Sequence, residues 1–181
     1  MRKLYGPEFY SERQPGQSLT KGILVGAAGG LAGTIVMDLF GLAVLLVNGG
    51  PDTISFSLIG DAAASFFSKL GVPITGGTPL GLLLHYLIGL LLGITFGGGM
   101  ALFVNQNIGR KKWVAIGILY VEAMSIPMLT AASIVLQMTP SQTALYFATS
   151  FTMHLVFGSV LGLAQSYGQR SRRVTNARAS S

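Results

Sequence analysis

The sequence predicts an all-α polytopic membrane protein with four transmembrane helices arranged as two repeated hairpins, and a short external amphipathic helix. Half of the residues are apolar and only 10% are charged, whereas a typical soluble domain carries about 25% charged residues. Four apolar runs, at residues 22–48, 79–104, 113–138 and about 144–167, reach the roughly 20 residues needed to cross a bilayer. We therefore expect one membrane domain over residues 21–167.

The first apolar run follows a polar segment, residues 1–20, which we expect to be a cytoplasmic arm. A secretory signal has a shorter apolar region of about 7–15 residues. Because this run is longer and Asp38 interrupts it, we predict a retained span.

Glycines recur at helical spacing in the first, second and fourth spans. Small residues four positions apart allow helix backbones to approach closely in lipid. Such a face packs either against another copy of the chain or, more simply, against another span of the same chain. The glycines predicted to serve packing are Gly26, Gly30, Gly33, Gly89, Gly93, Gly158 and Gly162.

A short amphipathic helix is predicted outside the membrane, within residues 53–71. Gly49, Gly50 and Pro51 end the first span, since Gly suits a helix C-terminus and Pro cannot continue the helix. Apolar residues then recur at helical spacing with polar ones opposite. The segment is too short to span, so we expect it to lie on the outer membrane face or to cap the bundle.

A Thr-Pro pair opens both the second and the fourth span, at Thr78-Pro79 and at Thr139-Pro140. Thr is a favoured N-cap residue, and Pro is tolerated at the first helical position. We therefore predict that both spans begin at these pairs.

The third span carries Trp113 at its start and Pro127 inside it. Trp113 suits the aromatic belt at a membrane interface. Pro127 removes one backbone hydrogen bond, which predicts a kink. After the fourth span the tail, residues 168–181, is rich in Arg and Ser, and we expect it to be basic, disordered and cytoplasmic.

Basic residues are distributed unevenly between the two sets of loops. Of the 12 Lys and Arg residues, only Lys69 falls in the loop between the first two spans; the others lie in residues 1–21, 110–112 and 170–178. This is the positive-inside pattern. It predicts an inner-membrane protein with both termini cytoplasmic, in contact with lipid headgroups and without a role in nucleic-acid binding.

The two hairpins share a pattern of ionisable residues. The motif His-x-x-x-Gly-x-x-Leu-Gly occurs twice, beginning at His85 and at His154, the chain's two histidines. In the first and third spans an acid, Asp38 or Glu122, follows a glycine by five positions. The order acid, His, acid, His suggests two hairpins related by an axis along the membrane normal.

Ionisable groups inside a bilayer cost about 2.5–3.5 kcal/mol or more each, so they need partners. Heights estimated from about 1.5 Å per residue place Asp38 near His85 and Glu122 near His154. Two acid–His pairs at different depths are therefore easier to build than one cluster of all four residues.

Three interpretations of these residues remain open. They fix helix packing through hydrogen bonds, they exchange protons, or they hold a divalent metal or a haem. A buried acid–His pair is a candidate for titration near neutral pH, because burial and pairing act in opposite directions. The metal candidates are His85, His154, Asp38 and Glu122, but no Glu-x-x-His motif of the di-iron bundles occurs.

Enzymatic motifs are lacking in the sequence. There is no Gly-x-Ser-x-Gly, no phosphate-binding loop and no His-Glu-x-x-His, and the absence of Cys removes thiolate chemistry. We therefore expect a non-enzymatic protein.

The segment 119–129, in which Glu122 is followed by Ser125-Ile126-Pro127, resembles the third span of the YagU-like inner-membrane proteins. His85 and His154 also fall where that family places histidines. The resemblance covers about residues 20–167 and implies a four-span bacterial protein associated with acid resistance. The position of Glu122 can be His in that family and Asp38 has no clear counterpart, so the resemblance does not imply a shared metal site.

The leading functional hypothesis is a non-enzymatic membrane protein whose acid–His pairs sense or relay protons. The alternative is an accessory subunit of a larger membrane complex, or a homo-oligomer, in which the glycine faces pack on partners and the histidines hold haem or a metal.

Overall fold

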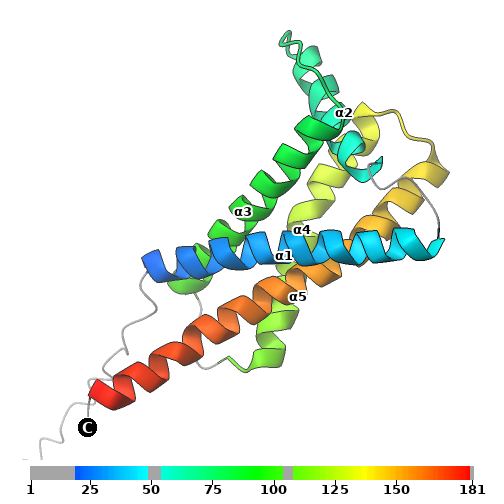
Figure 1. Cartoon of the computed structure of the whole chain (residues 1–181). Helices are drawn as coiled ribbons and strands as arrows, with labels where there is room; N and C mark the ends of the chain where they lie inside the picture. The colour runs from blue at the N-terminus through cyan, green and yellow to red at the C-terminus, as the bar shows by residue number, and fades with distance from the viewer. Residues whose placement is uncertain (1–18, 49–53, 104–107, 180–181) are drawn as a thin grey trace, which may run out of the picture.

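The computed structural model describes residues 19–48, 54–103 and 108–179, and these residues form five helices (Figure 1). The helices are α1 (Leu19–Asn48), α2 (Ile54–Lys69), α3 (Thr78–Phe103), α4 (Arg110–Val135) and α5 (Pro140–Ala179). The described residues contain no strand. Four helices, all but α2, contain segments long and apolar enough to cross a membrane. The predicted all-α class with four candidate spans is therefore confirmed.

The turn between α4 and α5 lies slightly earlier in the chain than the sequence predicted. Helix α4 ends at Val135, where Gln137 adopts a left-handed backbone conformation with φ of 52° and the Met138 amide donates to the Ser133 carbonyl. This is the six-to-one hydrogen bond of a Schellman ending. Helix α5 then begins at Pro140, as the Thr-Pro pair predicted, so the helix starts before the apolar run of about 144–167.

Thr139 forms a reciprocal cap at the start of α5. The Gln142 amide donates to Thr139 Oγ1, and the Thr139 amide donates to Gln142 Oε1 at 2.9 Å. This is a capping box, in which the N-cap and N3 side chains each satisfy a backbone amide of the other. The Thr-Pro pair thus begins the helix as predicted, and the sequence also contained the Gln that completes the box.

The C-terminal tail is helical where the sequence predicted disorder. Helix α5 continues without interruption to Ala179. Extending an existing helix costs far less than nucleating one, and the tail contains Arg, Gln and Ala, which are good helix formers, with no proline. The predicted arm, residues 1–20, falls almost entirely outside the described residues.

The bundle is built from two closely packed helix pairs that cross each other. Helix α3 packs along α1, and α5 packs along α4. Helix α1 also packs against α5, and the two cross near the centre of the molecule (Figure 1). Helix α2 packs mainly against the start of α3. The core therefore lies where the two pairs meet, and its buried residues are Phe96, Trp113, Val121, Phe157 and Leu161.

Trp113 does not lie where the sequence predicted. Its side chain is 1% exposed and contacts the ring of Phe96. A residue of an interfacial aromatic belt faces lipid headgroups, whereas this indole fills the core between α3 and α4. The correction follows from tertiary packing, because a large ring buries more apolar surface than any other side chain.

The predicted glycine faces pack inside the chain. A Cβ atom at Gly26 would collide with the Gly93 carbonyl oxygen, and one at Gly30 would collide with that of Gly89. Gly33 lies on a different face of α1 and contacts Phe157 of α5. Of the two interpretations open from the sequence, packing within one chain accounts for these glycines.

The same close approach occurs between α4 and α5. A Cβ atom at Gly158 would overlap Ile118, and one at Gly162 would overlap Trp113 and Val114 of α4. In both helix pairs, the lack of a glycine side chain lets the backbones touch.

Pro127 lies inside α4, and the bend that the sequence predicts at this proline stays a prediction.

Helix α2 is anchored at one end of the bundle. Asp61 Oδ1 accepts a hydrogen bond of 2.7 Å from the Gly77 amide, immediately before α3. The apolar side chains of Phe66, Phe67 and Leu70 are exposed at the end of the helix. Their contact with a membrane surface stays a prediction.

Candidate functional site

Asp38 of α1 and His85 of α3 are in direct contact. His85 Nε2 lies 2.9 Å from Asp38 Oδ1, which is hydrogen-bond distance. Thr34, one turn before Asp38, packs against Gly89, one turn after His85. Because Gly89 has no side chain, α1 and α3 approach closely enough for the acid and the imidazole to meet.

Aromatic residues surround this first pair. The Phe56 ring of α2 packs edge-on against the His85 ring, with centroids 5.2 Å apart. The Tyr86 side chain lies beside Asp38. The Asp38 carboxylate is thus hydrogen-bonded to His85, and Phe56 of α2 packs against the imidazole.

Glu122 of α4 and His154 of α5 form a looser pair. His154 Nδ1 lies 3.8 Å from Glu122 Oε2, too far for a hydrogen bond. Both His154 Nδ1 and the other carboxylate oxygen, Glu122 Oε1, are buried without a hydrogen-bond partner among the described residues. Unsatisfied buried polar atoms are uncommon in native proteins, which distinguishes this pair from the first.

The structure brings together the residues that the estimated heights placed together, as two pairs and not as one cluster. Among the described residues, no group of three or more His, Asp or Glu side chains is arranged to hold a metal ion. A metal centre built from all four candidates therefore finds no support.

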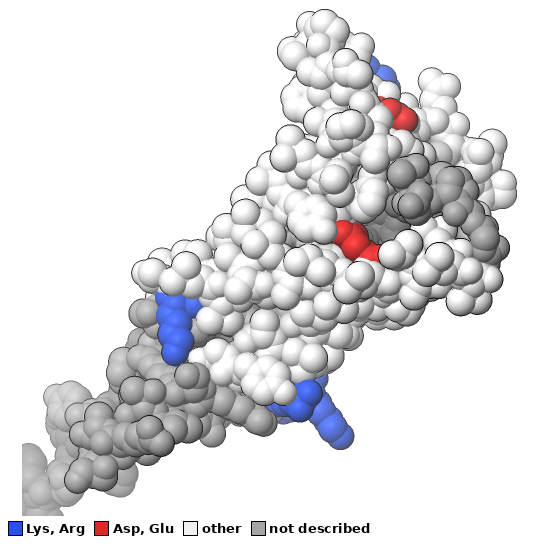
Figure 2. Space-filling model, in the orientation of Figure 1, with Lys and Arg blue, Asp and Glu red and all other residues white. Residues whose placement is uncertain are grey.

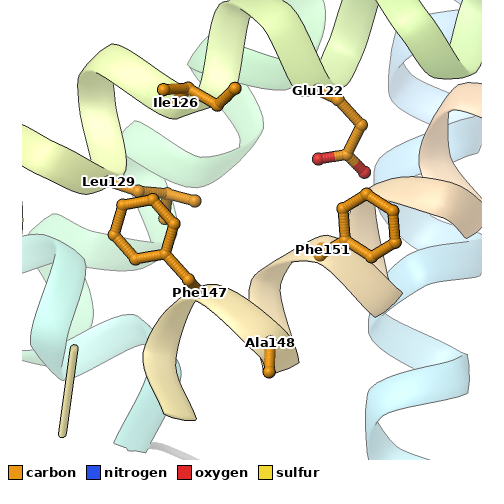
Figure 3. Close-up of a pocket in the computed structure, with 6 residues that line it drawn as sticks. All are labelled: Glu122, Ile126, Leu129, Phe147, Ala148 and Phe151. Carbon is orange, nitrogen blue, oxygen red and sulfur yellow. The ribbon is translucent and has the colours of Figure 1, made fainter. Parts of the chain in front are cut away.

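A pocket opens beside Glu122, between α4 and the first half of α5 (Figure 3). Its volume is about 370 Å³. The Glu122 carboxylate points into the space between the two helices, toward the ring of Phe151 (Figure 3). The remaining lining residues are apolar: Ile126, Leu129, Phe147 and Ala148. Glu122 is thus the one acidic residue in an otherwise hydrophobic wall.

Sequence reasoning missed the pocket although its signal was present. Glu122, Ile126 and Leu129 are spaced at helical intervals on one face of α4, and Phe147 and Phe151 are one turn apart on α5. Residues at such spacing share a helix face. The sequence did not show that these two faces are opposite each other.

Gln165 is a buried polar residue that the sequence analysis did not single out. Its side chain is fully buried, and Nε2 donates to the Gly22 carbonyl at 3.3 Å, while Oε1 has no partner among the described residues. A polar amide side chain within an apolar run is the sequence feature that could have indicated this residue. It joins α5 to the start of α1 beside Gly97.

No protein-family model, curated protein or solved structure matches the chain. The resemblance to the YagU-like proteins therefore stays a prediction from the motifs, and the function must be argued from the residues.

Proposed function

We propose that this chain is an integral membrane protein, inserted in the inner membrane, whose two acid–His pairs bind and release protons within the bilayer. The observation that carries the proposal is that each closely packed helix pair brings one acid next to one histidine within its membrane-spanning segments, at 2.9 Å for the first pair and 3.8 Å for the second. Ionisable side chains inside a membrane are costly and usually serve proton or ion movement.

The distribution of charge supports a topology with cytoplasmic termini. Lys21, Arg110, Lys111 and Lys112 lie at the end of the bundle where α1 and α4 begin, and Lys69 lies at the opposite end, on α2 (Figure 2). Positively charged residues near spans favour the cytoplasmic side. On this topology α2 is external, where it covers the His85 side of the first pair.

Matching contacts support a repeated hairpin. One turn before each acid, Thr34 or Ile118 touches the glycine one turn after the facing histidine. Two turns before each acid, Gly30 or Val114 touches the next glycine of the motif. In both helix pairs, the acid and the histidine are therefore aligned in the same way relative to the glycine contacts.

Proton exchange is tested by observing the two imidazoles directly. The protein is labelled on histidine and followed by NMR in nanodiscs between about pH 4 and pH 8, where imidazoles normally titrate. His85→Ala and His154→Ala assign the two signals. We expect the imidazole signals to change with pH. If neither signal changes while a free histidine added to the same sample titrates, the pairs serve packing alone.

The proposed physiological setting is acid stress, which rests on the resemblance to the YagU-like proteins. A strain whose growth at low pH depends on this chain should lose that growth when both histidines are replaced. If cells with the wild-type protein and cells with the doubly substituted protein survive equally well at low pH, with equal amounts of protein in the membrane, the histidines have no part in acid resistance.

A further inference from the structure

We propose that the pocket between α4 and α5 binds a lipophilic organic cation, whose charge is held by Glu122. This binding site goes beyond proton exchange by the acid–His pairs and does not depend on it. It is carried by a carboxylate that points into an apolar pocket and has no donor for one of its oxygens among the described residues.

The carboxylate needs a partner that the described residues do not supply. Among the described residues, His154 Nδ1 lies 3.8 Å from Glu122 Oε2, and Glu122 Oε1 has no hydrogen-bond partner. A buried acid without a donor or a counter-charge is costly. A cation entering the pocket would supply the missing charge.

The lining residues select an organic cation over a metal ion. A hard metal cation takes about six oxygen ligands, whereas this wall offers one carboxylate, with aliphatic and aromatic side chains around it. Aromatic faces attract cations through the ring quadrupole, and Phe147 and Phe151 both line the space. A quaternary ammonium ion with an apolar substituent matches this chemistry.

The dimensions of the pocket agree with a small molecule. A volume of about 370 Å³ lies within the range of roughly 300–1,000 Å³ that is usual for small-molecule sites. In the fold the pocket lies between two helices of one hairpin, so an amphipathic molecule dissolved in the bilayer can reach it sideways.

Binding is tested with benzyltrimethylammonium, titrated calorimetrically into the full-length protein in nanodiscs at about pH 8, where a normal carboxyl group is ionised. Empty nanodiscs provide the blank. We expect saturable binding, and we expect Glu122→Gln to weaken it about tenfold or more. Asp61→Asn is the matched control, since it removes a carboxylate on α2 and keeps an acceptor for the Gly77 amide; it should bind like wild type.

A second pair of variants keeps the test decisive if Glu122→Gln does not fold. Phe151→Leu retains the carboxylate and an apolar wall but removes one ring, and should weaken binding about three- to fivefold. Phe66→Leu, at an exposed ring of α2, should leave binding unchanged.

Competition with the uncharged isostere, neopentylbenzene, separates charge recognition from simple partition into an apolar crevice. The isostere should displace the cation poorly. Equal displacement by the isostere, or wild-type affinity in a folded Glu122→Gln protein, would overturn the proposal.

Discussion

The two acid–His pairs start from one sequence pattern and end in different environments. In the first, a hydrogen bond of 2.9 Å joins the carboxylate to the imidazole, and the Phe56 ring packs against the imidazole. In the second, the acid and the imidazole stand 3.8 Å apart beside an open pocket. A motif thus sets which residues face each other, while the neighbouring helices decide whether their polar atoms find hydrogen-bond partners.

The largest expected effect tests whether the two hairpins are equivalent in packing. Gly93→Val and Gly162→Val should each prevent stable folding, because the new side chain would meet backbone of α1 or α4. Ordinary overpacking costs about 1–3 kcal/mol, and a backbone obstacle cannot rotate away. Thermal unfolding in detergent, with size-exclusion profiles, measures the loss.

Gly99→Ala is the matched control for these glycines, because a Cβ atom there has nothing within 4 Å. It should unfold at or slightly above the wild-type temperature, since Ala favours a helix over Gly. If Gly162→Val behaves like this control while Gly93→Val does not fold, the hairpins are not equivalent.

Replacing each acid should change the free energy of unfolding by different amounts in the two pairs. Asp38→Leu should destabilise the protein by about 1–3 kcal/mol, because it leaves His85 without its hydrogen-bond partner. Glu122→Met should lower the free energy of unfolding little or even raise it, because it removes a buried oxygen that has no hydrogen-bond partner among the described residues. Chemical unfolding of both variants gives the difference, and equal losses would contradict the asymmetry.

A double-mutant cycle measures each pairwise contact directly. Combining Asp38→Leu with His85→Leu should show a coupling of about 1 kcal/mol or more, and combining Glu122→Met with His154→Leu should show a coupling near zero. The measurement is the same unfolding free energy. A larger coupling energy in the second pair would mean that Glu122 and His154 come into direct contact in the membrane.

The smallest expected effect compares the two Thr-Pro helix starts. Thr139→Ala should cost about 0.5–2 kcal/mol, since it removes the capping box with Gln142. Thr78→Ala should cost less, because no such reciprocal bond is found at Thr78 among the described residues. Gln142→Ala should lower the free energy of unfolding by part of the same amount. If Gln142→Ala causes no loss, the capping box does not contribute to stability.

Much of the fold could be predicted because it depends on local properties of the chain. The four spans follow from the length of the apolar runs, and the start of α5 follows from Thr139 and Pro140. The meeting of Asp38 with His85 could be estimated from helix rise alone. The failures concern context: Trp113 is buried in place of facing the interface, and the tail extends α5.

The amino-acid sequence alone specifies four apolar helices, two with an acid and two with a histidine, because length, hydropathy and helix periodicity are encoded residue by residue. Only the tertiary structure decided that the first pair is closed, that the second faces a pocket, and that Gln165 is buried. These outcomes depend on how the helices cross. The crossing is set by glycine contacts between residues far apart in the chain, which no local pattern specifies.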